Sequence, residues 1–216
     1  DRECRLCLAP AVWNGKDPIL KERLFGLTNA EGNHGEDVKE HWWHLDATPT
    51  ASYAKARYRY PLAAFPYEQL LRENRERGRE QSEFELEDTG IFDAGRFVDL
   101  EVEWAKAAPD DLCWIVRLIN HADEPAELDV VPTAWFRNTW SWGCTHEGCG
   151  LKPTIALDRD GTLALTHETL GKMRLAVSGK PQWLFTDNET NHERLDGVAN
   201  DSPWVKDAFD RRIVVR

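Results

Sequence analysis

The sequence predicts a mainly β protein, an antiparallel β-sandwich with a short helical insertion. Short apolar segments recur about every 8 to 15 residues and are separated by turn signals, which is typical of sheets packed face to face. The chain has 216 residues, 41% of them hydrophobic and 30% charged. That size allows a single domain over residues 1–216 with a core that needs neither disulfides nor metals.

The first third of the chain contains two predicted strands around a long polar stretch. Residues 4–13 predict a strand that ends at the turn signal Asn14-Gly15. Residues 16–37 contain three glycines and little periodicity, so we expect a long loop, and loops of that length are usually functional. Residues 38–45 predict the next strand, which carries Trp42 and Trp43.

The helical insertion is expected at about residues 50–78. Residues 50–60 are rich in helix formers, and Pro66 stands where a second helix would begin. Tyr67, Leu70 and Leu71 form the buried stripe of that second helix, and its remainder is charged up to Gly78.

The rest of the chain predicts strands and one short final helix. Asp158 to Gly161 are typical of a hairpin turn, and Ser202-Pro203 predicts a helix that runs to Phe209. The expected strands lie at 84–88, 97–104, 112–120, 126–136, 154–157, 162–166, 172–177 and 182–185.

Charge and cysteine usage narrow the class of protein. The net charge of −11 argues against a nucleic-acid ligand, because phosphates repel such a surface. No apolar run approaches the roughly 20 residues that cross a bilayer, so we expect no membrane partner. No signal peptide is recognisable, and the five cysteines have no regular spacing. We therefore expect a cytoplasmic protein with free thiols. A disulfide between Cys4 and Cys7 or between Cys144 and Cys149 is the alternative.

Two long stretches carry a resemblance to a known family. They are LFGLTNAEGNHGEDVKE at 24–40 and PTAWFRNTWSW at 132–142. Both resemble glycoside hydrolase family 63, in its bacterial branch, whose members are similar to mannosyl-oligosaccharide glucosidases. Three further stretches add to the similarity: WNGKDPILKER at 13–23, YRYPLAAFPY at 58–67 and FTDNETN at 185–191.

The resemblance implies an amino-terminal, supersandwich-like β-sandwich that precedes a large (α/α) helical barrel. In that family the barrel holds the acid and the base of inverting α-glucoside hydrolysis, so no catalytic residue is carried over to this chain. We expect a non-catalytic domain that supports and borders the barrel's active site. Its partners would be the carboxy-terminal helical domain and a carbohydrate, either an oligosaccharide or a glucoside. No cofactor and no metal are expected.

Polar residues of the long loop are the first candidate site. Asn33, His34, Glu36 and Asp37 can hydrogen-bond sugar hydroxyls at the rim of a neighbouring active site. A purely structural role for the loop is the alternative, since its glycines permit tight backbone turns.

Catalysis by carboxylates of this chain itself is a further alternative. Inverting hydrolysis needs two carboxyl groups about 6.5–9.5 Å apart. The candidates are Glu31, Glu36 and Asp37 in the loop, or Asp187 and Glu189 near the end.

Arg137, Trp140 and Trp142 are the second candidate site. They follow a predicted strand, and in an extended segment Trp140 and Trp142 share one face. That face is either an aromatic platform for sugar or a seam that docks onto the helical domain. An exposed docking face also makes a homodimer an expectation.

Two other interpretations stay open. A stand-alone carbohydrate-binding module would show a compact aromatic platform and little other exposed apolar surface. A zinc site would need Cys4, Cys7, Cys144 and Cys149 together, although Cys4 and Cys7 fall on opposite faces of the predicted strand.

Overall fold

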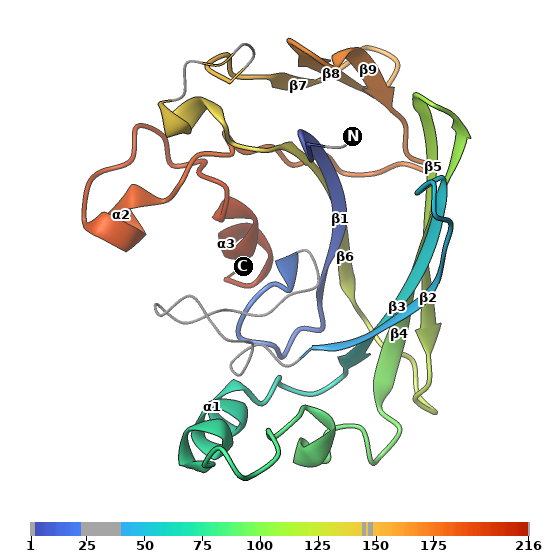
Figure 1. Ribbon diagram of the computed structural model, residues 1–216, viewed down its shortest axis with the longest axis vertical. Helices are drawn as coiled ribbons and strands as arrows, with labels where there is room; N and C mark the ends of the chain where they lie inside the picture. Colours follow the sequence, from blue (N-terminus) through green and yellow to red (C-terminus); the bar gives the residue numbers. More distant parts are fainter. Residues whose placement is uncertain (1–2, 23–39, 144–145, 147–148, 216) are drawn as a thin grey trace. The chain divides into compact units, whose positions relative to one another are not determined.

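The computed structural model describes residues 3–22, 40–143, 146 and 149–215. The prediction of a mainly β fold with antiparallel sheets is confirmed (Figure 1). The chain forms two compact units, the larger at Ala9–Pro132 and the smaller at Asp1–Leu8 with Thr133–Arg216. The prediction of one domain over 1–216 stays a prediction, and each unit is described by itself.

Four strands make the main sheet of the larger unit, in the order β2, β3, β4, β5. Their bounds are His41–Ala47, Tyr53–Pro61, Phe97–Ala108 and Asp111–Asn120. All three pairings are antiparallel, and irregularities fall between His44 and Asp46 and between Lys106 and Ala108. A separate two-stranded sheet consists of β1 (Leu6–Trp13) and β6 (Asp129–Phe136), and each of these strands runs from one unit into the other.

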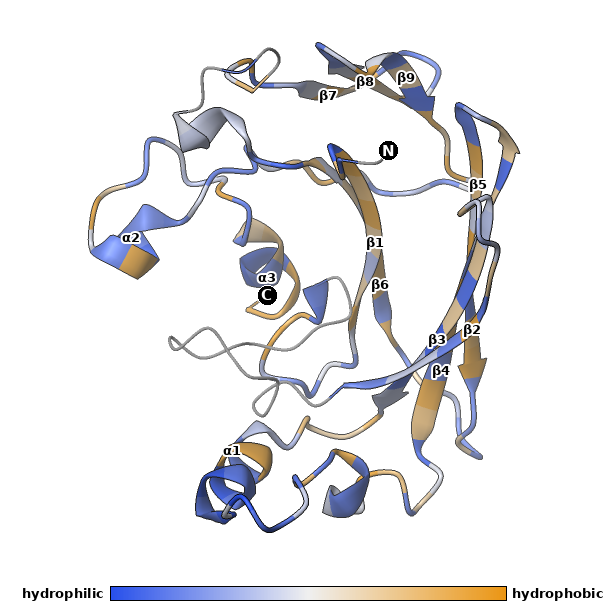
Figure 2. Ribbon diagram, in the orientation of Figure 1, coloured by the Kyte–Doolittle hydropathy of each residue, from blue (hydrophilic) through white to orange (hydrophobic). Residues whose placement is uncertain are grey.

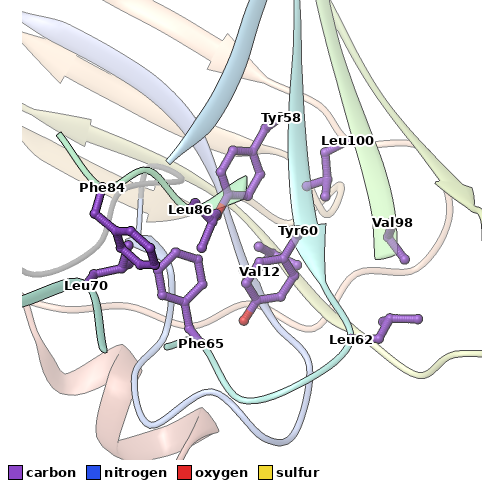
Figure 3. Close-up of a cluster of buried hydrophobic side chains, with 10 residues drawn as sticks. All are labelled: Val12, Tyr58, Tyr60, Leu62, Phe65, Leu70, Phe84, Leu86, Val98 and Leu100. Carbon is purple, nitrogen blue, oxygen red and sulfur yellow. The ribbon is translucent and has the colours of Figure 1, made fainter. Parts of the chain in front are cut away.

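The core of the larger unit lies on one face of this sheet. Tyr58 and Tyr60 of β3 and Leu100 of β4 are fully buried, and Val12 of β1 packs against them (Figure 3). The remaining labelled side chains come from β4 and from the segments around helix α1: Leu62, Phe65, Leu70, Phe84, Leu86 and Val98. This face-to-face packing of β1 on the sheet has the layering expected of a sandwich.

The prediction of a helical insertion is wrong for its first segment and right for its second. Residues 53–61 form β3, because Tyr58 and Tyr60 point into the core while Arg57 and Arg59 alternate with them on the other face. Period-2 burial therefore overrides the helix propensity of this segment. The second helix is confirmed as α1 (Tyr67–Glu76), which follows Pro66 and is largely hydrophilic in Figure 2.

Phe84 and Leu86 also depart from the prediction. Both side chains are buried, but their segment is a loop that leads into the 3-10 turn η2 (Glu87–Thr89) rather than a strand. Side chains from a loop can alternate between core and solvent without sheet pairing, so alternating apolar and acidic residues do not by themselves establish a strand.

The smaller unit contains a three-stranded antiparallel sheet of β7 (Thr154–Leu157), β8 (Leu163–His167) and β9 (Gly171–Leu175). Gly161, at φ +86°, makes the predicted turn between β7 and β8. Phe136, Leu163 and Leu165 form its buried cluster.

Short elements complete the smaller unit: the 3-10 turn η3 (Trp140–Trp142), α2 (His192–Asp196) and α3 (Ala208–Ile213). Residues 182–185 are not a strand, and the final helix begins later than Pro203. Among the described residues, no helix is long and apolar enough to cross a membrane.

Candidate functional site

Three of the predicted site residues lie on the turn that follows β6. Arg137 comes directly after the strand, and Trp140 and Trp142 begin and end η3. Gly143, at φ 64°, takes the left-handed conformation that closes the turn. The expected extended segment is therefore wrong, and because a 3-10 turn has three residues per turn, Trp140 and Trp142 point in different directions.

Trp140 is the inward residue of this turn. Its indole Nε1 donates a 2.8 Å hydrogen bond to Oε1 of Glu189. Its ring packs against the buried cluster around Phe136 and Leu165. An indole that combines apolar packing with a satisfied N–H is well fixed, so Trp140 anchors the turn to the smaller unit.

Trp142 is the outward residue of the same turn. Its side chain is 59% exposed. The guanidinium carbon of Arg137 lies 5.2 Å from the centroid of the Trp142 ring, a cation–π contact. We call Arg137 and Trp142 the exposed pair. A flat ring with this much free surface can stack on a sugar or pack against another domain.

Glu189 receives a second donor from outside the turn. Nζ of Lys152 lies 2.6 Å from Oε1 of Glu189, the oxygen that Trp140 also contacts. Burial of the carboxyl would raise its pKa, but the bonds from Lys152 and Trp140 outweigh burial and hold the pKa below its usual value. A general acid of inverting hydrolysis needs the opposite shift, so Glu189 is poorly suited to that role.

Two asparagines join the stretches 132–142 and 185–191. Nδ2 of Asn138 donates to the carbonyl of Asn188 at 2.9 Å, and Nδ2 of Asn188 donates to the carbonyl of Phe136 at 2.6 Å. Asn188 itself has φ +52°, a left-handed conformation that asparagine tolerates better than most residues. Two stretches that share the family resemblance therefore meet through side-chain hydrogen bonds.

A second cluster, in the larger unit, centres on the buried residue Lys21. Lys21 is 0% exposed, and its Nζ lies 2.6 Å from Oε1 of Glu40. The same Nζ lies 3.3 Å from the centroid of the Phe65 ring and 4.5 Å from that of Tyr67. The ammonium is therefore enclosed by a carboxylate and two aromatic rings.

Three tyrosine hydroxyls complete this cluster. Tyr58 donates to Oε2 of Glu40 at 2.6 Å. Tyr60 and Tyr67 donate to Oδ2 and Oδ1 of Asp17 at 2.9 and 3.3 Å. We call these six residues the Lys21 cluster: Asp17, Lys21, Glu40, Tyr58, Tyr60 and Tyr67.

A turn at residues 14–17 holds Asp17, one end of the Lys21 cluster, in place. Oδ1 of Asn14 accepts from the backbone N–H groups of Lys16 and Asp17, and Nδ2 of Asn14 donates to the carbonyl of Pro61 at 2.7 Å. Nε1 of Trp13 bonds the carbonyl of Asp17. Residues 14–22 of this motif form bends and turns outside the named strands and helices, as the sequence predicts for residues 16–22, but Asn14, Asp17 and Lys21 are buried.

Burial sets the protonation of the Lys21 cluster. It lowers the pKa of Lys21 and raises the pKa of Glu40, while the ion pair between them opposes both shifts. Burial likewise raises the pKa of Tyr58. Lys21 is fully covered, so the cluster is placed to hold the interior together rather than to meet a substrate.

The predicted loop site lies between the two partners of this ion pair in the sequence. Asn33, His34, Glu36 and Asp37 fall in residues 23–39, which are outside the described residues. The same holds for Glu31. Their roles stay predictions.

Charged side chains form a ladder on the sheet face opposite the core. Arg59 donates to both oxygens of Asp99, at 2.8 and 3.1 Å, and Nε2 of His121 lies 3.0 Å from Oδ2 of Asp99. Arg57 pairs with Glu101 at 2.7 Å. Burial alone would raise the pKa of Asp99, but the bonds and charge of Arg59, with His121 and Arg57, hold it below its usual value.

The sequence predicts that all the cysteines are free thiols, and this prediction is wrong for one of them. Cys149 is disulfide-bonded, whereas Cys4 and Cys113 carry free thiols. Within the described ranges, no group of three or more His, Cys, Asp or Glu side chains is arranged to hold a metal ion.

The chain is similar to a longer yeast protein. It is 37% identical over 250 aligned residues to "Uncharacterized protein YMR196W" of Saccharomyces cerevisiae, with 99% of this chain and 23% of that protein covered. The chain thus spans about a quarter of the length of this relative. No family model matches the chain, and no solved structure matches it.

The sequence missed the partners that fix these clusters. The sequence indicates Glu189 only as a candidate catalytic carboxylate, and it does not predict the roles of Lys152 and Lys21. For Glu189 a signal existed, because it lies in one of the stretches that carry the family resemblance. For Lys152 we find none, since a lysine in a polar loop resembles any solvated lysine.

Proposed function

We propose that the chain is a non-catalytic β-sheet part of a family 63-like glycoside hydrolase of the inverting α-glucosidase type. In this proposal it supports and borders the active site of an (α/α) barrel domain, which carries the acid and the base. Its cellular site is the cytoplasm. A rigid neighbouring sheet helps catalysis by positioning the sugar and excluding water.

Exposed apolar side chains of the smaller unit carry this proposal. Among the described residues, fourteen large hydrophobic side chains are exposed, and nine of them belong to this unit. Trp204 and Trp142 are the largest, at 63% and 59% exposure. The other seven are Leu151, Leu157, Val177, Phe185, Leu195, Val198 and Val215. Exposed apolar side chains in this number are what we expect of a unit that another domain partly covers.

The length of the yeast relative agrees with a partner on the same polypeptide. That protein continues well beyond the part that matches this chain. A domain joined covalently to its partner can expose apolar surface when it is considered by itself, because the partner covers that surface in the whole protein.

The environments of the buried carboxylates support a non-catalytic role. Glu40 and Asp17 are bonded to tyrosines within the Lys21 cluster, and Asp99 is bonded to Arg59. Glu189 is bonded to Lys152 and has a lowered pKa. Each is held by donors from its own unit, whereas hydrolysis needs an acid and a base directed at a bound sugar.

The exposed pair is the part of this surface best suited to meet sugar. The ring of Trp142 offers an apolar surface for stacking, and the Arg137 guanidinium beside it can donate to hydroxyls. Trp140 then acts by holding the turn. Asn33, His34, Glu36 and Asp37 belong to the same proposal as sugar contacts.

The alternative is a stand-alone carbohydrate-binding module. The exposed pair by itself would fit that function. A module should otherwise show little exposed apolar surface, so the nine side chains of the smaller unit favour a docked domain.

Hydrolysis by the purified chain tests the proposal. Incubation with a nitrophenyl α-glucoside should release no nitrophenol above the buffer rate, because the acid and the base lie on the barrel. Glu36→Gln should leave that background unchanged. Steady turnover that disappears in Glu36→Gln would show catalysis on this chain and contradict the proposal.

Binding separates the two candidate functions. Titration of the chain with maltose and longer α-glucans, followed by tryptophan fluorescence, should show at most millimolar affinity. Micromolar binding that Trp142→Ala abolishes, with Trp114→Ala as the control, would instead favour the carbohydrate-binding module.

A further inference from the structure

Strand β5 ends the main sheet of the larger unit and exposes apolar side chains on both faces. It is the last strand in the order β2, β3, β4, β5 and is ten residues long. Leu112 and Leu118 on one face and Ile115 and Ile119 on the other are each 39–45% exposed. Figure 2 shows hydrophobic colour along part of β5. Proteins usually protect such an edge, because it is a template for pairing with another strand.

The hydrogen bonds between β4 and β5 show which peptide groups face outward. Val98 pairs with Asn120, so Phe97 and His121 are the next pair along the two strands. The N–H of His121 donates to the carbonyl of Phe97 at 3.0 Å, which makes this a hydrogen-bonded pair. Hydrogen-bonded pairs alternate along an antiparallel ladder, so the odd-numbered residues of β5 direct their peptide groups to β4. The even-numbered residues direct theirs outward. Within the described part of the chain, these outward groups have no backbone partner: Leu112, Trp114, Val116 and Leu118.

A second β5 can pair with this edge in a register that suits its charges. In a two-fold antiparallel pairing centred on Trp114, the outward groups of both strands meet, as a ladder requires. Asp111 then stands opposite Arg117 of the second copy, and Arg117 opposite its Asp111. These are the charged residues of β5, and Arg117 is half-exposed although it binds Glu103 at 2.6 Å. Several registers bring the outward peptide groups of the two strands together. We choose this one because it places Asp111 opposite Arg117.

We propose that two copies of this chain associate edge to edge through β5, antiparallel and centred on Trp114. The contact joins two four-stranded sheets into one continuous sheet. It involves residues of the larger unit, whereas the proposed function depends on apolar side chains of the smaller unit, so either proposal can fail without the other.

The register predicts a specific disulfide. Cys113, which is free and exposed, would stand opposite Ile115 of the second copy in a non-hydrogen-bonded pair. The Cα atoms of such a pair are about 4.5 Å apart, which a disulfide can span. Ile115→Cys should therefore give a covalent dimer on oxidation with diamide, read on a non-reducing gel. Adding Cys113→Ser should abolish it.

Ile119→Cys is the matched control. Ile119 lies on the same face of β5 with similar exposure, but in this register it lies beyond the end of the second copy's β5, which begins at Asp111, and not opposite Cys113. It should give no covalent dimer above the unmodified chain. Equal cross-linking of Ile115→Cys and Ile119→Cys would overturn the register and with it the proposal.

Oligomeric state gives the second test. Sedimentation of the unmodified chain at micromolar concentrations should show a dimer. Asp111→Lys places like charges together at two positions and should raise the dissociation constant about tenfold, with unchanged circular dichroism. A monomer throughout this range, or a dimer that Ile115→Cys does not cross-link, would overturn the proposal.

Discussion

Lys21 shows how one buried charge can organise the interior of a unit. Its ammonium is fully buried, so Glu40, the nearby charge of Asp17 and two aromatic rings replace the solvation it would have at the surface. Such an ion pair need not be more stabilising than a well-packed apolar pair, but removal of one partner leaves the other buried and uncompensated. The geometry of the cluster therefore depends on all its members together.

Replacement of Lys21 by methionine should destabilise the chain strongly. Lys21→Met leaves the Glu40 carboxyl buried without its cation, and we expect a loss of about 3–5 kcal/mol in the free energy of unfolding. Urea denaturation followed by circular dichroism measures it. Lys106→Met, at an exposed lysine of β4, is the control and should change the free energy by less than about 0.5 kcal/mol. Equal effects of the two substitutions would contradict the structural role of Lys21.

The Lys21 cluster could not be predicted from the sequence, for a physical reason. Lysine, glutamate and aspartate are mostly exposed in proteins, so a polar stretch containing them suggests a loop. Their burial depends on aromatic residues that are distant in the sequence, such as Phe65 and Tyr58. The turn at Trp140 was only partly predictable: the sequence singled out its residues, but Glu189 and Lys152 reach it from distant segments.

The sheet of the larger unit shows how β3 and β4 combine two different faces. One face buries Tyr58, Tyr60 and Leu100, and the other pairs the arginines of β3 with the carboxylates of β4. Opposite charges directly across an antiparallel pair fix the register, because a slip of one residue would send them into the core.

Acid should weaken this ladder through Asp99. Its folded pKa lies below the usual 3.8, so its contribution is fully present above about pH 4 and is lost as the pH falls through the folded pKa. Asp99→Asn should lower the free energy of unfolding by about 1–3 kcal/mol at pH 7, and the difference from the unmodified chain should shrink below pH 4. Urea titrations at several pH values measure it. A difference that stays constant down to pH 2 would show that Asp99 is not held by its charge.

Strands are predicted where apolar residues alternate with polar ones or form a short continuous run between turn signals. In β4 and β8 large apolar residues recur at every second position, whereas β5 is a nearly continuous apolar run. The helix formers of residues 50–60 predict a helix, yet Tyr58 and Tyr60 alternate with arginines, and this alternation of buried and exposed side chains makes 53–61 a strand. Short helices such as α2 were missed, since one or two turns leave no periodic pattern.

The chain as a whole distributes its exposed apolar residues unevenly between two units. The larger unit gathers most of its large side chains into one core, whereas the smaller unit leaves tryptophans on its surface. If another domain covers that surface, the isolated chain should attract apolar ligands there.

Binding of a hydrophobic dye tests this asymmetry. The chain should enhance the fluorescence of anilinonaphthalene sulfonate, and Trp142→Ser with Trp204→Ser should reduce the enhancement by about half or more. Leu45→Ser, at an exposed residue of the larger unit, is the control and should have little effect. An equal reduction by Leu45→Ser would argue against a covered face on the smaller unit.

The asparagine bonds of the smaller unit bear on the order in which it folds. Asn188 reaches the carbonyl of Phe136 across 52 residues, and Trp140 reaches Glu189 across 49. Closing such long loops is slow compared with forming the hairpins of β7, β8 and β9, whose partners are near in the sequence. The surface around Trp140 should thus be among the last parts to mature, and a nascent chain would need Asn188 and Glu189 before that surface exists.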